Sequence, residues 1–190
     1  MHQKDVNTMC LKVSVYIATS LDGYIARENG DLDWLDAANA TVQEGEDCGF
    51  LKFMESIDVL VMGRKTYEKV LSFGMWPYDD TPVIVLSRNK IEFPKDLNQH
   101  VTCSSESPIE LCERLAINGA NRLYIDGGIT IQRFLADGLI TDMTITVIPV
   151  VLGGGIPLFK NLEKGISLEH VATKSFDFGF VQLTYNVKNA

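Results

Sequence analysis

Three short apolar runs, each followed by a polar or glycine-rich turn, constrain the fold of this chain more than any other feature. The runs span residues 58–62, 82–86 and 122–125. Short runs rich in Val, Ile and Leu are typical of strands buried on both faces, as in parallel sheets. Ligands bind just beyond the carboxyl ends of such strands. The three turns, with their Arg, hydroxyl and glycine residues, therefore predict a site for a multiply phosphorylated ligand at one edge of a sheet.

The remaining segments predict an α/β fold. Helical spacing or capping signals mark four segments: residues 41–56 (capped by Asn39 or Thr41), 66–72, 109–117 and 130–136. Strand composition marks further segments: residues 11–18, 101–103, 142–151, 168–175 and 180–187. The last two read as an antiparallel pair. We therefore expect a three-layer α/β fold, in which helices flank a mainly parallel central sheet with antiparallel C-terminal strands.

The composition favours one globular domain without a metal centre. The 190 residues suit a single domain at residues 11–190, after a flexible leader at residues 1–10. The four cysteines form no C-x-x-C pair and only three histidines are present, so a metal site has little support. A net charge of −8 argues against nucleic-acid binding. No run approaches the roughly 20 apolar residues of a membrane helix, and the leader lacks signal-peptide character, so we expect a cytoplasmic protein.

The first turn joins a strand to a helix and contains Gly63, Arg64, Lys65 and Thr66. A helix start offers unpaired N–H groups and the positive end of the helix dipole, and Arg can bind phosphate through two parallel hydrogen bonds. The spacing is not that of a P-loop. Taken alone, the same residues also fit an ordinary turn with solvated cations, and both interpretations stay open.

The other two turns allow the same two interpretations. Ser87 and Arg88 can offer a hydroxyl and a guanidinium to a terminal phosphate, such as the 2′-phosphate of NADPH, or they can form a solvated strand end. Gly127 and Gly128 let the backbone approach a pyrophosphate closely because they lack a Cβ atom, or they form a tight turn. Their spacing is not the G-x-G-x-x-G fingerprint of dinucleotide-binding folds.

Two carboxylates are candidates for chemistry. Asp47 begins an amphipathic stretch ahead of the first turn, and Asp22 lies in a turn after the entering strand. Trp34 and nearby phenylalanines could form the wall for a flat aromatic substrate, although such residues more often belong to the core. A carboxyl group shielded by aromatic side chains would have a raised pKa and could hold or pass a proton.

Five segments, taken together and in order, resemble the dihydrofolate reductase superfamily, especially the branch that includes the reductase domain of riboflavin biosynthesis. They are residues 20–26, 61–68, 86–88, 126–128 and 152–159, and the resemblance covers about residues 11–187. It implies an NADPH-dependent reductase that transfers a hydride to a pterin- or pyrimidine-like heterocycle or a related small molecule. The activity would be similar to that of 5-amino-6-(5-phosphoribosylamino)uracil reductase or of dihydrofolate reductase.

The resemblance also implies the residues of the site. NADPH would be bound by Gly63, Arg64, Lys65, Thr66, Leu86, Ser87, Arg88, Asp126, Gly127, Gly128, Ile129 and Thr130. The substrate would contact Asp22, Trp34, Asp47 and Leu51, with Asp47 as the first choice and Asp22 as the second choice for the catalytic carboxylate. In such proteins the paired glycines often lie across a cis peptide bond.

Two further expectations concern function and assembly. A protein that keeps the cofactor cleft but lacks catalysis, acting as a nucleotide-binding regulator, is the alternative to an enzyme. The apolar C-terminal strands at residues 142–151 and 180–187 would leave long edges that a monomer must protect. Because related reductases often pair through this region, the resemblance implies a homodimer.

Overall fold

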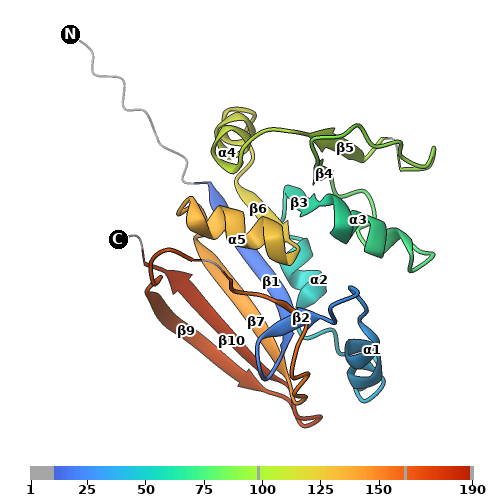
Figure 1. Cartoon of the computed structure of the whole chain (residues 1–190), viewed down its shortest axis with the longest axis vertical. Coiled ribbons are helices and arrows are strands. Elements are labelled where there is room, and N and C mark those ends of the chain that lie inside the picture. The colour runs from blue at the N-terminus through green and yellow to red at the C-terminus, as the bar shows by residue number, and fades with distance from the viewer. Residues whose placement is uncertain (1–10, 98, 161, 189–190) are drawn as a thin grey trace.

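One eight-stranded sheet organises the part of the chain that the computed structural model describes, namely residues 11–97, 99–160 and 162–188 (Figure 1). The expected leader at residues 1–10 lies outside these residues. The strand order is β5-β4-β3-β6-β1-β7-β10-β9. The strands are β1 (Lys12–Ser20), β3 (Val59–Gly63), β4 (Val83–Leu86), β5 (Val101–Ser104), β6 (Arg122–Asp126), β7 (Asp142–Ile148), β9 (Leu168–Ser175) and β10 (Val181–Val187).

The sheet is mixed, and most of its strands are parallel. The six strands from β5 to β7 in this order run parallel to one another, whereas β10 is antiparallel to both β7 and β9. A separate two-stranded sheet pairs β2 (Tyr24–Ala26) with β8 (Ile156–Pro157). The predicted fold class, a mainly parallel α/β sheet with antiparallel C-terminal strands, is confirmed.

Helices cover both faces of this sheet. They are α1 (Asp33–Asn39), α2 (Phe50–Met54), α3 (Arg64–Leu71), α4 (Pro108–Ile117) and α5 (Gly128–Ala136). Side chains of α4 and α5 pack into one core cluster, and those of α2 and α3 pack into another on the opposite face. In the described part of the chain, no helix is long and apolar enough to cross a bilayer.

Alternation along the central strands divides the core between the two faces. Val61 and Ile84 belong to the cluster under α4 and α5, whereas Leu60 and Met62 belong to the cluster under α2 and α3. All four are almost fully buried. Strands buried on both faces have apolar residues at every position. This is why the runs at 58–62 and 82–86 were continuous rather than alternating.

The segment predicted as one helix over residues 41–56 instead consists of turns followed by one short helix, α2. Helix α1 ends at Asn39 and α2 begins at Phe50. Gly45 and Gly49 between them have φ values of 86° and 87°, and Cys48 has φ = 56°. Three left-handed residues cannot continue a right-handed helix. The expectation of a continuous helix was therefore wrong, and the interrupting turns form one wall of a pocket described below.

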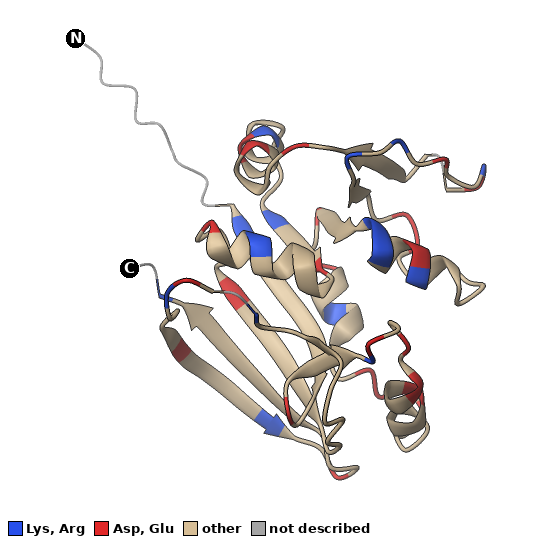
Figure 2. Ribbon diagram, viewed as in Figure 1, with Lys and Arg blue, Asp and Glu red and all other residues tan. Residues whose placement is uncertain are grey.

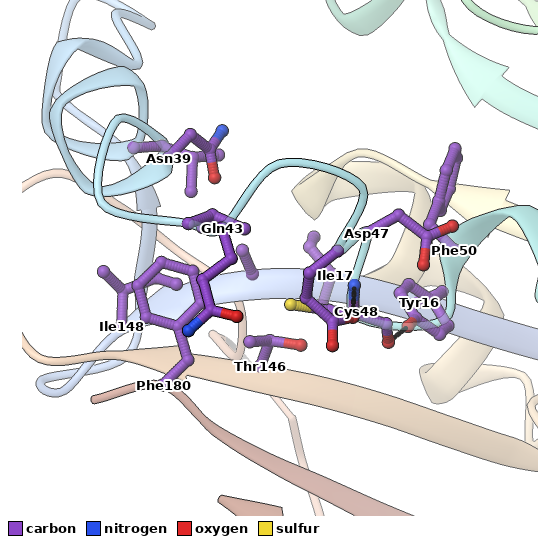
Figure 3. Close-up of a pocket in the computed structure, with 14 residues that line it drawn as sticks. Tyr16, Ile17, Asn39, Gln43, Asp47, Cys48, Phe50, Thr146, Ile148 and Phe180 are labelled. Atoms are coloured by element: carbon purple, nitrogen blue, oxygen red, sulfur yellow. Dashed lines mark hydrogen bonds between the residues drawn. The ribbon is translucent and has the colours of Figure 1, made fainter. Parts of the chain in front are cut away.

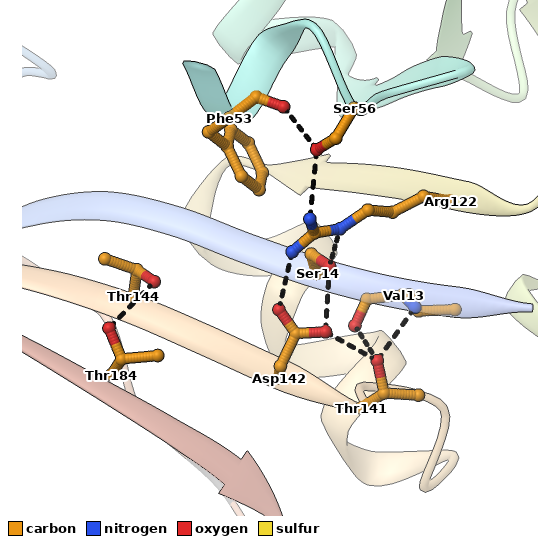
Figure 4. A network of polar contacts seen from close by, with 9 residues as sticks. All are labelled: Val13, Ser14, Phe53, Ser56, Arg122, Thr141, Asp142, Thr144 and Thr184. Atoms are coloured by element: carbon orange, nitrogen blue, oxygen red, sulfur yellow. Dashed lines mark hydrogen bonds and ion pairs between the residues drawn. The ribbon is translucent and has the colours of Figure 1, made fainter. Parts of the chain in front are cut away.

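A polar network ties the amino ends of the central strands together (Figure 4). The Arg122 guanidinium contacts Asp142 Oδ1 at 3.0 Å, Ser14 Oγ at 2.8 Å and Ser56 Oγ at 2.9 Å. It also lies 5.1 Å from the ring centroid of Phe53. The network joins β6, β1 and β7 to the residues after α2. It is a structural anchor at the end of the sheet opposite the predicted site.

Candidate active site

Two helices begin side by side at the carboxyl ends of adjacent strands. Strand β3 leads into α3 through Gly63, and β6 leads into α5 through Gly127. A Cβ atom on Gly63 would meet Thr130 Oγ1 at 2.8 Å, and a Cβ atom on Gly127 would collide with Thr66 Oγ1. Each glycine therefore packs against the threonine of the other turn, which brings the two helix starts together.

These helix starts can attract an anion. Neither helix has a side-chain cap, so no cap side chain accepts a hydrogen bond from the first N–H groups of α3 and α5. The dipoles of both helices place partial positive charge at the same edge of the sheet. Gly127 needs to be glycine for a second reason, because its φ of 89° is disfavoured for residues with a Cβ atom.

The third turn lies at the same edge, on the far side of β3. Leu86 pairs with Gly63 in the β3–β4 ladder, which places Ser87 and Arg88 next to the start of α3. The Ser87 hydroxyl donates to the Asn89 carbonyl at 2.8 Å, and Arg88 is exposed. The structure thus brings the three predicted turns to one edge, on the neighbouring strands β4, β3 and β6.

The structure shows contacts of Arg64 and Gly128, and a peptide-bond geometry after Gly127, that sequence patterns did not indicate. Arg64 Nε lies 2.7 Å from Glu68 Oε1, an exposed pair of the kind that contributes little to stability. A Cβ atom on Gly128 would meet Ile25 Cδ1 at 2.9 Å, so this glycine also makes room for β2. No cis peptide bond occurs in the described residues, and the expectation of one between Gly127 and Gly128 was therefore wrong.

Asp126, at the end of β6, is the titratable group whose environment is most unusual at this edge. Burial raises its pKa to about 6, although the N–H of Gly127, 2.7 Å from Oδ1, works in the opposite direction. Burial also raises the pKa of Tyr78 and Tyr124, and the nearby Asp126 carboxylate adds to both shifts. A carboxyl group with such a pKa can hold or release a proton near neutral pH.

A pocket of about 500 Å³ opens beside the carboxyl halves of β1 and β7 (Figure 3). This volume suits a small organic ligand. Fourteen described residues line the pocket: Tyr16, Ile17, Ala18, Leu35, Asn39, Val42, Gln43, Glu46, Asp47, Cys48, Phe50, Thr146, Ile148 and Phe180. Strand β1 lies between β6 and β7, so the pocket and the three turns lie on either side of it.

Asp47 lines this pocket, but its pKa is not raised as expected. Its Oδ2 accepts from the N–H of Leu51 at 2.7 Å, and its Oδ1 accepts from the N–H of Gly49 at 2.7 Å. These hydrogen bonds stabilise the charged form and hold the pKa below its ordinary value. The aromatic side chains nearby do not enclose the carboxylate, which is exposed. The expectation of a raised pKa was therefore wrong.

The structure does not bring Asp22 together with Asp47. The Asp22 carboxylate accepts from Ser20 Oγ at 2.6 Å and from the N–H groups of Leu152 and Gly153 at 3.1 and 2.7 Å. These bonds lower its pKa, the Ser20 hydroxyl contributing most. Asp22 thus anchors the glycine-rich loop at residues 152–155, and it is not among the described residues that line the pocket.

The other two residues predicted to contact the substrate also lie outside the described pocket lining. Trp34 is 5% exposed and packs with Ile148 and Phe180 in the cluster behind the pocket. Leu51 on α2 is 67% exposed. Trp34 is therefore a core residue, one of the two interpretations that the sequence allowed, and Leu51 lies at the surface.

Sequence patterns missed a hydrogen-bond network in the pocket wall. The Tyr16 hydroxyl donates to the Cys48 carbonyl, and Gln182 Nε2 lies 3.0 Å from both Tyr16 Oη and that carbonyl. Gln182 Nε2 also donates to Thr146 Oγ1 at 3.1 Å. These residues come from β1, β10, β7 and the turn before α2. Only pairing of distant strands brings them together, and no local motif marks them.

The fold is of the dihydrofolate reductase-like class. Dihydrofolate reductase from Enterococcus faecalis, solved with NADP(H), matches with a TM-score of 0.61 and 18% identity over 94% of this chain and 97% of its own. The deaminase/5-amino-6-(5-phosphoribosylamino)uracil reductase of Thermotoga maritima matches with a TM-score of 0.70 and 13% identity over 94% of this chain and 57% of its own. At these identities the likeness shows the shared fold alone.

Within this class, the chain belongs to the RibD C-terminal domain family, whose model matches residues 11–181. It is 39% identical to the uncharacterized protein YwjB of Bacillus subtilis over 178 residues, 92% of this chain and 97% of YwjB. A candidate riboflavin biosynthesis protein from Shewanella sp. PV-4 matches with a TM-score of 0.88 and 43% identity, over 94% of this chain and all of that one. Members of the family are typically NAD(P)H-dependent reductases.

Proposed function

We propose that this protein is an NADPH-dependent reductase that transfers a hydride to a pterin- or pyrimidine-like heterocycle. The observation that carries this proposal is the pair of helix starts at the ends of β3 and β6, which the reciprocal glycine–threonine contacts hold together. A pocket with an ionised carboxylate lies across β1 from them. Family membership supports the same reaction class.

The residues at the three turns fit NADPH. The N–H groups and dipoles at the starts of α3 and α5 suit the two phosphates of a dinucleotide. Thr66 and Thr130 add hydroxyls at the same two helix starts. Ser87 and Arg88, at the end of β4, suit the additional 2′-phosphate that distinguishes NADPH from NADH.

When bound, NADPH supplies the hydride. The chain's own residues then have three tasks. Asp47, kept ionised by two backbone N–H groups, accepts hydrogen bonds from ring N–H or amino groups and orients the ring. Phe50, Ile148 and Phe180 pack against the flat faces of the ring and exclude water. Asp126, with a pKa of about 6, can hold a proton at the edge of the sheet.

One observation favours the alternative of a nucleotide-binding regulator without catalysis. The carboxylates of Asp22 and Asp47 both accept backbone N–H groups and both have lowered pKa values, as residues that merely anchor turns would. The two functions differ in one measurable respect. A reductase oxidises NADPH in the presence of a suitable heterocycle, whereas a regulator binds NADPH without oxidising it.

Cofactor titration tests the assignment of the three turns to NADPH, which the proposed reductase requires. NADPH should bind more tightly than NADH, and Arg88→Ala should weaken NADPH binding by about 1.5–3 kcal/mol, the range for a charged hydrogen bond. NADH binding should hardly change. Lys90→Ala is the matched control, because Lys90 is an exposed cation two residues away that belongs to none of the turns. Equal affinity of the unmutated protein for NADPH and NADH, or an equal effect of both substitutions, would contradict the proposal.

A further inference from the structure

The pocket beside β1 has an acidic wall that the proposed hydride transfer does not by itself require. Glu46 and Asp47 both line it, and none of its fourteen described lining residues is Lys, Arg or His. The remaining polar groups include the amides of Asn39 and Gln43 and the hydroxyl of Thr146. These groups can bind neutral polar atoms, but they supply no positive charge for an anion.

The two carboxylates are held in place by the turn that carries them. Glu46 Oε1 accepts from the N–H of Cys48 at 2.7 Å, while Asp47 accepts from the N–H groups of Gly49 and Leu51. The turn itself is anchored to the sheet, because the Cys48 carbonyl accepts a hydrogen bond from Gln182 at 3.0 Å. The carboxylates are therefore restrained from swinging away when a negatively charged group enters.

One basic side chain, Lys174, lies near this wall, and it already contacts Glu46 and Phe176. Lys174 Nζ on β9 lies 3.7 Å from Glu46 Oε2 and 4.1 Å from the ring centroid of Phe176. It balances one of the two negative charges, so the wall keeps a net negative charge. Figure 2 shows mainly acidic residues on α1 and the chain beside it, whereas α3 carries Glu68 together with the basic residues Arg64, Lys65 and Lys69.

We infer that Glu46, together with Asp47, selects against ligands that carry a negative charge, so that the substrate is a heterocycle without a phosphate group, either neutral or positively charged. This inference rests on the proposed function, because it takes the pocket as the substrate site. The cations suited to phosphate, Arg64, Lys65 and Arg88, lie instead at the turns that we assign to the cofactor. Glu46 is a specificity-determining residue in this scheme, and it takes no part in the proton transfer.

A matched pair of ligands tests the inference. Uridine and uridine 5′-monophosphate carry the same ring and ribose and differ only in the phosphate. Binding of each to the NADPH-loaded full chain is measured by calorimetry or ligand-observed NMR. Uridine should bind about tenfold more tightly, the effect expected for one uncompensated like-charge contact in a partly solvated site. The preference should shrink at high salt, because exposed charges are screened.

Charge-neutral variants show whether the wall causes the preference. Glu46→Gln combined with Asp47→Asn should reduce the preference to about twofold or less, by removing the repulsion. Glu44→Gln is the control, since Glu44 is exposed, lies two residues from Glu46 and is not among the lining residues. Glu44→Gln also removes a negative charge, but outside the pocket, and should leave the preference for uridine over its monophosphate unchanged.

Several outcomes would overturn the inference. They are tighter or equal binding of the monophosphate, a preference that survives the double substitution, an equal loss in Glu44→Gln, or failure of both ligands to bind at millimolar concentration. The affinity for NADPH, measured in the same samples, reports separately on the proposed function. A protein that binds uridine selectively but oxidises NADPH with no heterocycle would keep the charge selectivity of the pocket and contradict the reductase.

Discussion

Gly127→Ala should destabilise the protein because of two separate features of the site. The φ of Gly127 is 89°, and its new Cβ atom would collide with Thr66 Oγ1. A left-handed backbone costs a residue with a Cβ atom about 1–2 kcal/mol. Overpacking against a neighbouring side chain typically costs a further 1–3 kcal/mol or so. We therefore expect a loss of about 2–5 kcal/mol in the free energy of unfolding.

The two contributions can be separated by matched variants. Gly74 has φ = 75°, and a Cβ atom there would meet nothing within 4 Å. Gly74→Ala should therefore lower the free energy of unfolding only by the cost of the backbone conformation, about 1–2 kcal/mol. Thr66→Ala in the Gly127→Ala background should restore about 1–2 kcal/mol, because it removes the colliding hydroxyl. Urea denaturation of the four proteins measures these values. The reasoning fails if Gly127→Ala costs no more than Gly74→Ala, or if Thr66→Ala restores nothing.

Three further predictions concern pH, catalysis and assembly. The pKa of Asp126 is raised from 3.8 to about 6 on folding, so the folded state binds the extra proton between these values and stability falls as pH rises through them. Asp126→Asn should therefore gain about 1–3 kcal/mol relative to the unmutated protein at pH 7 but not at pH 4, which denaturation at both pH values would show. Asp47→Asn should leave NADPH affinity nearly unchanged and lower turnover by about 10²–10⁴-fold, once a reducible substrate is found; full activity would remove Asp47 from the site. The segments at residues 142–151 and 180–187, which we expected to provide the edges, contain the interior strands β7 and β10, and the edge strand is β9, every residue of which is exposed. We therefore expect a homodimer through β9, and light scattering that gives 21.1 kDa at micromolar concentration would count against it.

Local sequence patterns predicted the fold class and the edge of the sheet at which the predicted cofactor turns lie. The apolar runs at 58–62, 82–86 and 122–125 became β3, β4 and β6, which are neighbours in the sheet. A parallel strand buried on both faces needs apolar residues at every position, and this leaves a signal in a short local segment. Turns after such strands then fall at one edge by geometry alone. At the start of α4, Ser107 and Glu110 form a capping box, an interaction between residues close in the sequence.

The pocket depends on contacts between residues far apart in the chain, and the pKa values of the carboxyl groups near it depend on their burial and hydrogen-bond partners. Tyr16, Thr146 and Gln182 meet because β1, β7 and β10 pair, and their separation in the chain leaves no local pattern. The same holds for the carboxylates. A pKa depends on burial and on hydrogen-bond partners in space, so Asp47, held by two N–H groups, is acidic, while the enclosed Asp126 has a pKa of about 6. Residue type and spacing could mark these groups as candidates, but only their surroundings determined which of them keeps its proton.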